Sequence, residues 1–295
     1  MSPSPSSLPR FQATADGAAT PEMQAAYARD GFLVVEGFKA PGECDALRAR
    51  THELVEAFDP STVTSIFEAG GDQRHAADRY FRESGDEIRF FFEKGAFDEA
   101  GRLTKDKHAA MNKIGHAMHD LDPVFDRFSR DPKLANLARS LGLKDPGLVQ
   151  SMVIFKPPRI GGEVDCHQDA TFLHTDPVSV TGFWFALEDA DETNGCLIGI
   201  PGVQNAGLRE RFHYEGDRLV MDKLGEKDWP VEREVPLTAP KGTLVVLHGL
   251  APHRSSPNTS PRSREAYAVH VIDRSTRWSG DNWLRRRESL PVRGF

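Results

Sequence analysis

The chain lacks the features that mark several protein classes. It has only 3 cysteines among 295 residues and none in C-x-x-C spacing, which argues against a disulfide framework or a zinc site. No apolar run approaches the roughly 18 residues of a membrane-spanning helix. The net charge of −7 gives no electrostatic footprint for nucleic acid. These absences predict a cytoplasmic protein that binds neither nucleic acid nor a membrane and takes a small-molecule partner.

What the chain does have is the composition of a globular protein, with 39% hydrophobic and 27% charged residues. Residues 1–20 are rich in Ser, Pro, Ala and Thr and lack the apolar centre of a signal peptide, so we expect a disordered tail there. The chain contains no fixed-period repeat, and its β region contains no internal linker. A single domain over 21–295 is therefore predicted.

The first half of the chain predicts helices with a few strands. Residues 21–30 have the pattern of a helix that ends at Gly31, with a compact β-rich run behind it, and a second helix starts at Pro41. Residues 59–84 are polar and irregular, which is typical of a long loop or a lid. A strand is expected from about Glu87, and residues 108–143 are predicted to be mostly helical because apolar residues recur at three- and four-residue steps.

From Leu148 onward the pattern changes to short strands separated by Gly, Pro and Asn. The predicted strands lie within residues 149–156, 162–169, 178–189, 195–202, 242–249 and 265–272. The Asn194-Gly195 pair predicts a type I′ turn that joins two antiparallel strands into a hairpin. Residues 203–240 are polar without clear periodicity and are interpreted as a lid. The fold class is mainly β with supporting helices, as a sandwich or a barrel.

One His-x-Asp pair stands out within these strands. On a regular strand His167 and Asp169 would share one face, and a second histidine, His253, would complete a two-histidine, one-carboxylate set typical of non-haem Fe(II) enzymes. The pattern alone is weak, because His174 and Asp176 form a second copy of it. Pro177 follows that copy directly and favours a strand exit there.

Four stretches carry a resemblance to a known family. CHQDATFLHT, GFWFALEDADETNGCLIGIPG, GTLVVLHGLAPHRSSPN and SREAYAVHV resemble the phytanoyl-CoA dioxygenase family of Fe(II)/2-oxoglutarate oxygenases. The likeness extends from about Phe32 to Trp283. It implies a double-stranded β-helix (jelly-roll, cupin-like) core, with Fe(II), 2-oxoglutarate as co-substrate, and O2.

The resemblance also implies roles for single residues. The metal ligands would be His167, Asp169 and His253, with His248 as a rival for the last position. Arg264, 11 residues after His253, would hold the distal carboxylate of 2-oxoglutarate, since its fork binds a carboxylate through two nitrogens. The residues expected to complete the co-substrate pocket are Ser255, as a donor to that carboxylate, and Lys113, Met152 and Trp184 as lining. Met152 and Trp184 are equally compatible with the core, and Arg264 with the surface.

Two other functions remain open from the sequence. A cupin-like, metal-dependent isomerase or lyase would use a similar metal set but has no need of Arg264; a non-catalytic jelly-roll binding protein would not need a complete metal set. If the chain is an oxygenase, hydroxylation of a C–H bond is expected, because Asp169 fills the iron position that related halogenating enzymes leave for chloride. The basic residues that could bind an anionic substrate such as a carboxylate or an acyl-CoA, unless they are merely solvated, are Arg209, Arg211, His213, Arg218, Lys223 and Arg285 to Arg287, with Tyr214 among them.

Overall fold

The computed structural model describes residues 7–63, 65, 78–225 and 228–295. Half of the loop predicted over 59–84 lies outside these residues. The helices are α1 (Pro21–Asp30), α2 (Pro41–Ala57), α4 (Arg79–Arg82), α5 (Lys107–Ala110), α6 (Met118–Leu121), α7 (Pro123–Ser129) and α8 (Pro132–Ser140), with 3-10 turns η1 (Pro60–Thr62), η2 (Asp169–Thr171), η3 (Gln204–Ala206) and η4 (Val231–Arg233). The strands are β1 (Arg10–Gln12), β2 (Phe32–Glu36), β3 (Ile88–Phe92), β4 (Met111–His116), β5 (Pro146–Ile154), β6 (Val164–His167), β7 (Thr175–Asp176), β8 (Thr181–Ala186), β9 (Leu197–Gly199), β10 (Glu210–Glu215), β11 (Arg218–Lys223), β12 (Val235–Leu237), β13 (Leu244–His248), β14 (His253–Ser255), β15 (Ala266–Asp273), β16 (Arg277–Trp278) and β17 (Arg293–Gly294).

Two sheets form the centre of the fold. The large sheet has the order β1-β2-β13-β8-β15-β5-β4-β3, with β17 beside β5, and the small sheet has the order β12-β9-β14-β6. Buried apolar side chains of both sheets pack together, among them Trp184 of β8, Val245 of β13 and Leu237 of β12. Many neighbours in the sheets are distant in sequence, such as β2 and β13 or β6 and β14, as in a jelly roll. The predicted jelly-roll fold is confirmed.

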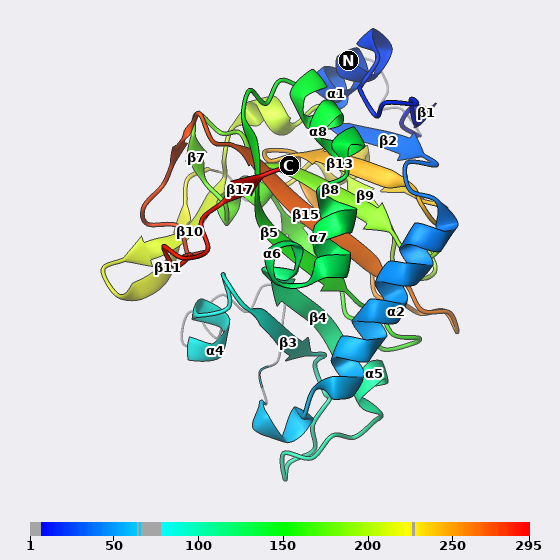
Figure 1. Ribbon diagram of the computed structural model, residues 1–295, viewed down its shortest axis with the longest axis vertical. Coiled ribbons are helices and arrows are strands. Elements are labelled where there is room, and N and C mark those ends of the chain that lie inside the picture. Colours follow the sequence, from blue (N-terminus) through cyan, green and yellow to red (C-terminus); the bar gives the residue numbers. More distant parts are fainter. Residues whose placement is uncertain (1–6, 64, 66–77, 226–227) are drawn as a thin grey trace.

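Helices cover the other face of the large sheet. Figure 1 shows α2, α7 and α8 lying across this face. The second apolar cluster joins Leu47 of α2, Phe125 of α7 and Leu137 of α8 to strand residues such as Phe185 and Tyr267. This helical layer packs against the face of the large sheet opposite the site and supports the strands that contribute site residues.

Helix α1 begins and ends where the sequence predicts, and α2 begins where the sequence predicts. Thr20 caps α1 by accepting a hydrogen bond from the Met23 amide at 3.3 Å. Gly31 ends the helix with φ of 76°, a conformation that glycine adopts without strain. Pro41 is the first residue of α2, because its missing N–H has no partner to lose at that position.

The prediction of a disordered tail over residues 1–20 is wrong at Leu8 and Arg10–Gln12. Arg10–Gln12 form β1, which pairs in parallel with β2, and Leu8 is buried in the core between the sheets. Arg10 Nε also contacts Glu36 Oε1 at 2.6 Å. A few side chains that pack or pair are enough to fix a segment of disorder-prone composition against a sheet edge.

The prediction of helix over residues 108–143 is wrong at Met111–His116. This segment is β4, which pairs with β3 on one side and β5 on the other. All but one of its residues are buried, so the alternation that marks a half-exposed strand is missing. Helices α6, α7 and α8 follow it as expected.

The hairpin predicted at Asn194-Gly195 is also wrong. β8 pairs with β13 and β15, whereas β9 pairs with β12 and β14, so the turn carries the chain from one sheet to the other. Gly195 has φ of 86°, but Asn194 has no positive φ and instead donates from its side chain to the Asp189 carbonyl at 2.8 Å. A Cβ on Gly195 would lie 2.6 Å from the side chain of Lys156. The glycine serves this close approach as well as the turn.

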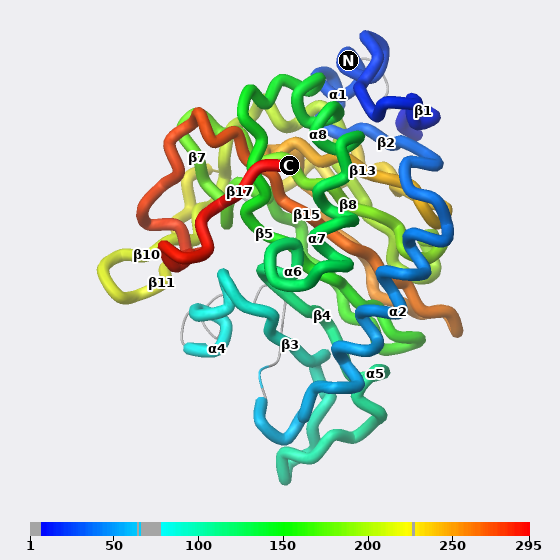
Figure 2. The backbone as a smooth tube through the Cα atoms, in the orientation of Figure 1, coloured from blue at the N-terminus to red at the C-terminus, as the bar shows by residue number. Residues whose placement is uncertain are grey.

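Residues 203–240 contain strands that the sequence did not reveal. β10 and β11 form a regular antiparallel hairpin that Figure 2 shows projecting from one side of the molecule. The Tyr214 amide donates to the Asp281 carbonyl at 2.7 Å, which joins the hairpin to the C-terminal segment. Only one side chain of β10, Phe212, is fully buried, so the alternating pattern is too weak to read. Among the described residues, no helix has the length and apolar character needed to cross a membrane.

Candidate metal centre and active site

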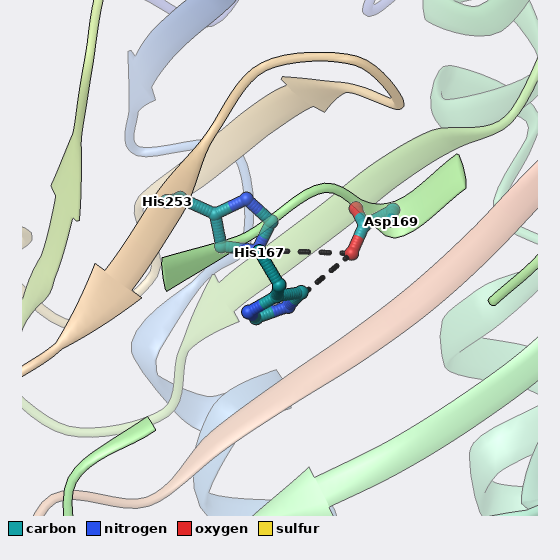
Figure 3. A group of neighbouring side chains, drawn as sticks. All are labelled: His167, Asp169 and His253. Atoms are coloured by element: carbon teal, nitrogen blue, oxygen red, sulfur yellow. Dashed lines mark ion pairs between the residues drawn. The ribbon is translucent and has the colours of Figure 1, made fainter. Parts of the chain in front are cut away.

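Three side chains converge at the end of the small sheet. His167 is the last residue of β6 and lies opposite His253, the first residue of β14, in antiparallel register. Their Nε2 atoms lie 3.8 and 3.7 Å from Asp169 Oδ1, respectively. The three candidate ligand atoms all lie within 4.8 Å of one another, and Figure 3 shows the two rings and the carboxylate directed to one point. One metal ion fits between these atoms.

The local route to this geometry differs from the prediction. The strand ends at His167, and Asp169 begins the 3-10 turn η2, so strand alternation does not place the two side chains together. The Ala170 amide donates to the Gly249 carbonyl at 2.9 Å, which holds this turn against the loop that leads to His253.

Backbone carbonyls orient the two imidazoles. His167 Nδ1 lies 2.8 Å from the Asp165 carbonyl, and His253 Nδ1 lies 3.1 Å from the Ala251 carbonyl. A carbonyl can only accept a hydrogen bond, so each Nδ1 carries the proton and each Nε2 presents a lone pair. In this tautomer Nε2 is the atom of each ring that can bind a metal.

The charge states suit the same role. Burial, together with the neighbouring His253, lowers the pKa of His167 to about 4. Burial works against the charge of Asp169, but His270, His253 and His167 outweigh it and hold its pKa well below the usual range. At neutral pH Asp169 is a carboxylate and His167 is a neutral imidazole, and both are ligands for a divalent first-row metal.

His270 is a neighbour of this set that the sequence did not indicate. Its Nε2 lies 3.3 Å from Asp169 Oδ1, and it stands opposite Gly182 in the pairing of β15 with β8. A Cβ on Gly182 would lie 2.8 Å from Asp169 Oδ2, so a side chain there would collide with the carboxylate. The one available signal was the polar residue at the end of the Ala266, Ala268, His270 alternation, which points it inward.

The rival residues lie elsewhere. His248 Nδ1 accepts from the Leu250 amide at 3.1 Å, and His174 lies beyond the ligand turn with its amide bonded to Asn282 Oδ1 at 3.0 Å. Neither belongs to the group that could hold a metal among the described residues. The structure therefore favours His253 over His248.

The two neighbours of His167 behave differently. Gln168 points away from the cluster and donates to the carbonyls of Gly207 and Leu250 at 2.9 and 2.8 Å. Its Oε1 accepts from the Arg209 amide at 2.9 Å, so this side chain ties the ligand turn to the start of the β10–β11 hairpin. Cys166, in contrast, contributes to the wall of the cavity described next.

A cavity of about 440 Å³ opens beside the metal set, between the two sheets. All five residues predicted for the co-substrate pocket line it, namely Lys113, Met152, Trp184, Ser255 and Arg264. Burial lowers the pKa of Lys113 to about 7. Lys156, which the sequence did not suggest, is buried next to Arg264, and its amide donates to the Arg264 carbonyl at 3.0 Å. Its ammonium donates to the carbonyl of Ser256 at 2.8 Å and to that of Gly162.

Arg264 is the most unusual group in this cavity. It is only 2% exposed, and its Nε and Nη1 atoms have no hydrogen-bond partner. Its guanidinium lies 5.6 Å from the centre of the Trp184 ring. Burial lowers its pKa to about 10, so it is still a cation at neutral pH. An unpaired buried cation is costly, and a bound carboxylate would supply the missing partner.

Comparison of the whole sequence with known families shows where a chain with this site belongs. Residues 27–266 match the phytanoyl-CoA dioxygenase (PhyH) family. The chain belongs to the phytanoyl-CoA dioxygenase family. It is thus a 2-oxoglutarate-dependent non-haem iron dioxygenase by family.

Individual relatives agree over nearly the whole chain. It is 45% identical to the phytanoyl-CoA dioxygenase domain-containing protein 1 of Danio rerio, over 89% of this chain and 93% of that protein. It is 42% identical to a phytanoyl-CoA dioxygenase of Arabidopsis thaliana, over 92% of this chain and 95% of that protein.

The fold is similar to that of the non-haem α-ketoglutarate-dependent carbocyclase SnoK from nogalamycin biosynthesis. The TM-score is 0.65 at 18% identity, with 95% of this chain and 98% of that chain covered.

Proposed function

We propose that this dioxygenase hydroxylates a C–H bond of a small organic substrate, with conversion of 2-oxoglutarate and O2 to succinate and CO2. One observation carries the proposal: a buried arginine with unpaired nitrogens shares a cavity with a two-histidine, one-carboxylate set. The first feature fits a dicarboxylate co-substrate and the second fits a non-haem iron.

The residues present fit Fe(II). His167 and His253 offer imidazole nitrogens with free lone pairs, and Asp169 offers a carboxylate oxygen, so three positions of an iron would be taken by protein. The Asp169 carboxylate leaves a divalent iron with net positive charge, to which an anionic keto acid is attracted. A bound iron of this kind supplies O2 activation coupled to decarboxylation of the keto acid.

The chain's own residues would then position the co-substrate. We assign the distal carboxylate of 2-oxoglutarate to Arg264 and to the hydroxyl of Ser255, which lies two residues from the ligand His253 on β14. Trp184, Met152 and Lys113 would line the same end of the cavity and exclude water from it. Asp169 occupies the position that a halide would need, which favours hydroxylation over halogenation.

An acyl-CoA substrate receives little support. Most of the basic residues considered for its phosphates already have partners: Arg211 contacts Asp281, His213 Nε2 lies 2.8 Å from Asp222, Arg209 stacks on Trp229 at 3.9 Å, Arg285 stacks on Tyr214 at 3.7 Å, Arg286 contacts Asp120, and Arg287 lies 3.6 Å from Asp86. A small molecule enclosed by the cavity fits better than a long thioester whose phosphates need free cations. The three free cysteines are compatible with the cytoplasm as its location.

Anaerobic addition of Fe(II) and 2-oxoglutarate tests the proposal. The expected result is a weak visible charge-transfer band that needs both components, followed by succinate release when O2 is admitted. An isomerase, a lyase or a binding protein on this fold would give neither signal. With a substrate in hand, a gain of one labelled oxygen from 18O2 would support hydroxylation; a chlorinated product in added chloride, or a desaturated product without oxygen, would contradict it.

A further inference from the structure

The cavity is also lined by polar residues that have no assigned role in holding the co-substrate. Three neighbouring strands of the large sheet each contribute one of these polar side chains, and together we call them the floor of the cavity. They are His270 on β15, Gln150 on β5 and His116 on β4. His270 is the direct cross-strand partner of Gln150, and His116 pairs with the next residue, Ser151. All three are buried and line the cavity. His116 therefore lies two strand spacings, about 10 Å, from His270, the residue that contacts Asp169.

The protons of His116 can be assigned from its partner. The Ser84 hydroxyl donates its single proton to the Phe81 carbonyl, at 2.6 Å. His116 Nδ1 lies 2.8 Å from the same hydroxyl oxygen, which can only accept from it. The proton of a neutral His116 is therefore on Nδ1, and Nε2 is left as an acceptor.

His116 is neutral under ordinary conditions. Burial, reinforced by the Lys113 charge, holds its pKa well below the usual range. Among the described residues, Nε2 has no hydrogen-bond partner, and neither has the side-chain amide of Gln150. The floor thus offers an imidazole acceptor and, next to it, an amide that can both donate and accept.

The walls around this floor are aromatic. Phe81 and Trp283 stack at 4.6 Å, and Trp283 lies edge-on to His116 at 5.3 Å. Phe172 and Phe212 meet at 5.9 Å on the side of the β10–β11 hairpin. A compact apolar body would pack against these rings, whereas a bare charge would lose its hydration without a counter-ion.

We propose that His116 and Gln150 form a substrate subsite for an uncharged molecule with a compact apolar body and a hydroxyl or N–H group. That group donates a hydrogen bond to His116 Nε2. The side-chain amide of Gln150 forms a second hydrogen bond with the same molecule. The role as substrate site rests on the proposed function, whereas the binding itself needs neither iron nor turnover. Selectivity comes from the acceptor: a molecule whose donor is methylated leaves Nε2 unpaired.

The tautomer is tested first, on the wild-type protein without metal. Nitrogen-15 NMR of the imidazoles should find His116 neutral at pH 7 with its proton on Nδ1. A proton on Nε2, or a doubly protonated ring, would overturn the subsite, because no acceptor would face the cavity. Because this measurement uses the wild-type protein, it does not depend on whether a variant folds.

Binding is tested with benzyl alcohol and its methyl ether as probes. We expect the alcohol to bind the metal-free wild type about fivefold more tightly than the ether, for one neutral hydrogen bond. His116→Phe keeps the ring but removes the acceptor and should abolish the preference, and Gln150→Leu should reduce it. His108→Phe, a half-buried histidine paired with Glu56, is the matched control and should retain it.

The opposing results are equally specific. Equal binding of alcohol and ether to wild type, an unchanged preference in a folded His116→Phe, or displacement of benzyl alcohol by coenzyme A would each overturn the subsite. Loss of the charge-transfer band with retained alcohol preference would remove the proposed function but leave the subsite, so the two failures can be told apart.

Discussion

Replacing Arg264 should separate co-substrate binding from folding. Its Nε and Nη1 atoms are buried without partners, so the free protein carries the cost of an unpaired cation. Arg264→Met removes that charge and nearly keeps the volume. We therefore expect the melting temperature without ligand to stay the same or rise, although most substitutions of buried residues destabilise.

The loss should be seen in the stabilisation by 2-oxoglutarate. A charge-assisted pair contributes about 1.5 to 3 kcal/mol, which corresponds to roughly ten- to a hundredfold in affinity. At a ligand concentration of 100 times the wild-type Kd, ligand binding stabilises by about 2.7 kcal/mol; the weakened variant would keep only about 0.4 to 1.4 kcal/mol. Arg264→Lys should recover part of the loss, since it restores the charge without the fork.

Thermal unfolding with anaerobic Fe(II), with and without 2-oxoglutarate, measures both quantities, and the KM for 2-oxoglutarate provides a second reading. Arg262→Met is the control, because Arg262 lies two residues away in an exposed pair with Asp191. Equal stabilisation by 2-oxoglutarate in the Arg264 and Arg262 variants would refute the reasoning. Lys113, in the same cavity, would then be the first candidate to hold that carboxylate.

Three further predictions follow from the same geometry. His167→Ala should abolish iron binding in anaerobic titrations, whereas His174→Ala should bind iron with near-normal affinity; the reverse order would mean that the second His-x-Asp pair holds the metal. His253→Ala should lose the charge-transfer band and His248→Ala should keep it, and loss of the band in both would give His248 a role at the metal. Burial lowers the pKa of Lys156 from its ordinary 10.5 to about 7, so between these pH values the folded state binds fewer protons than the unfolded state and the free energy of unfolding rises with pH. Lys156→Met should flatten that rise, as measured by urea titrations at several pH values. The same pH dependence in the variant and the wild type would contradict this prediction.

The sequence by itself predicted the outline of the fold and, through its resemblance to the family, the candidate residues of the site. Local signals were sufficient where a residue type has one function at one position, as with Gly31 and Pro41 at helix ends. The resemblance to the family also pointed to His253 and Arg264, which the structure places in one cavity. Ligands and co-substrate residues can be read in this way because they depend on chemical type, which the sequence states directly.

Only the tertiary structure decided which strands pair and which groups lack partners. β4 is a strand because β3 and β5 flank it, and Asn194-Gly195 is a crossing between sheets because their partners lie far away in the chain. The unpaired nitrogens of Arg264 and the acceptor at His116 Nε2 are likewise invisible in the sequence. Pairing and hydrogen-bond satisfaction depend on residues that are brought together only by folding, so no local pattern can encode them.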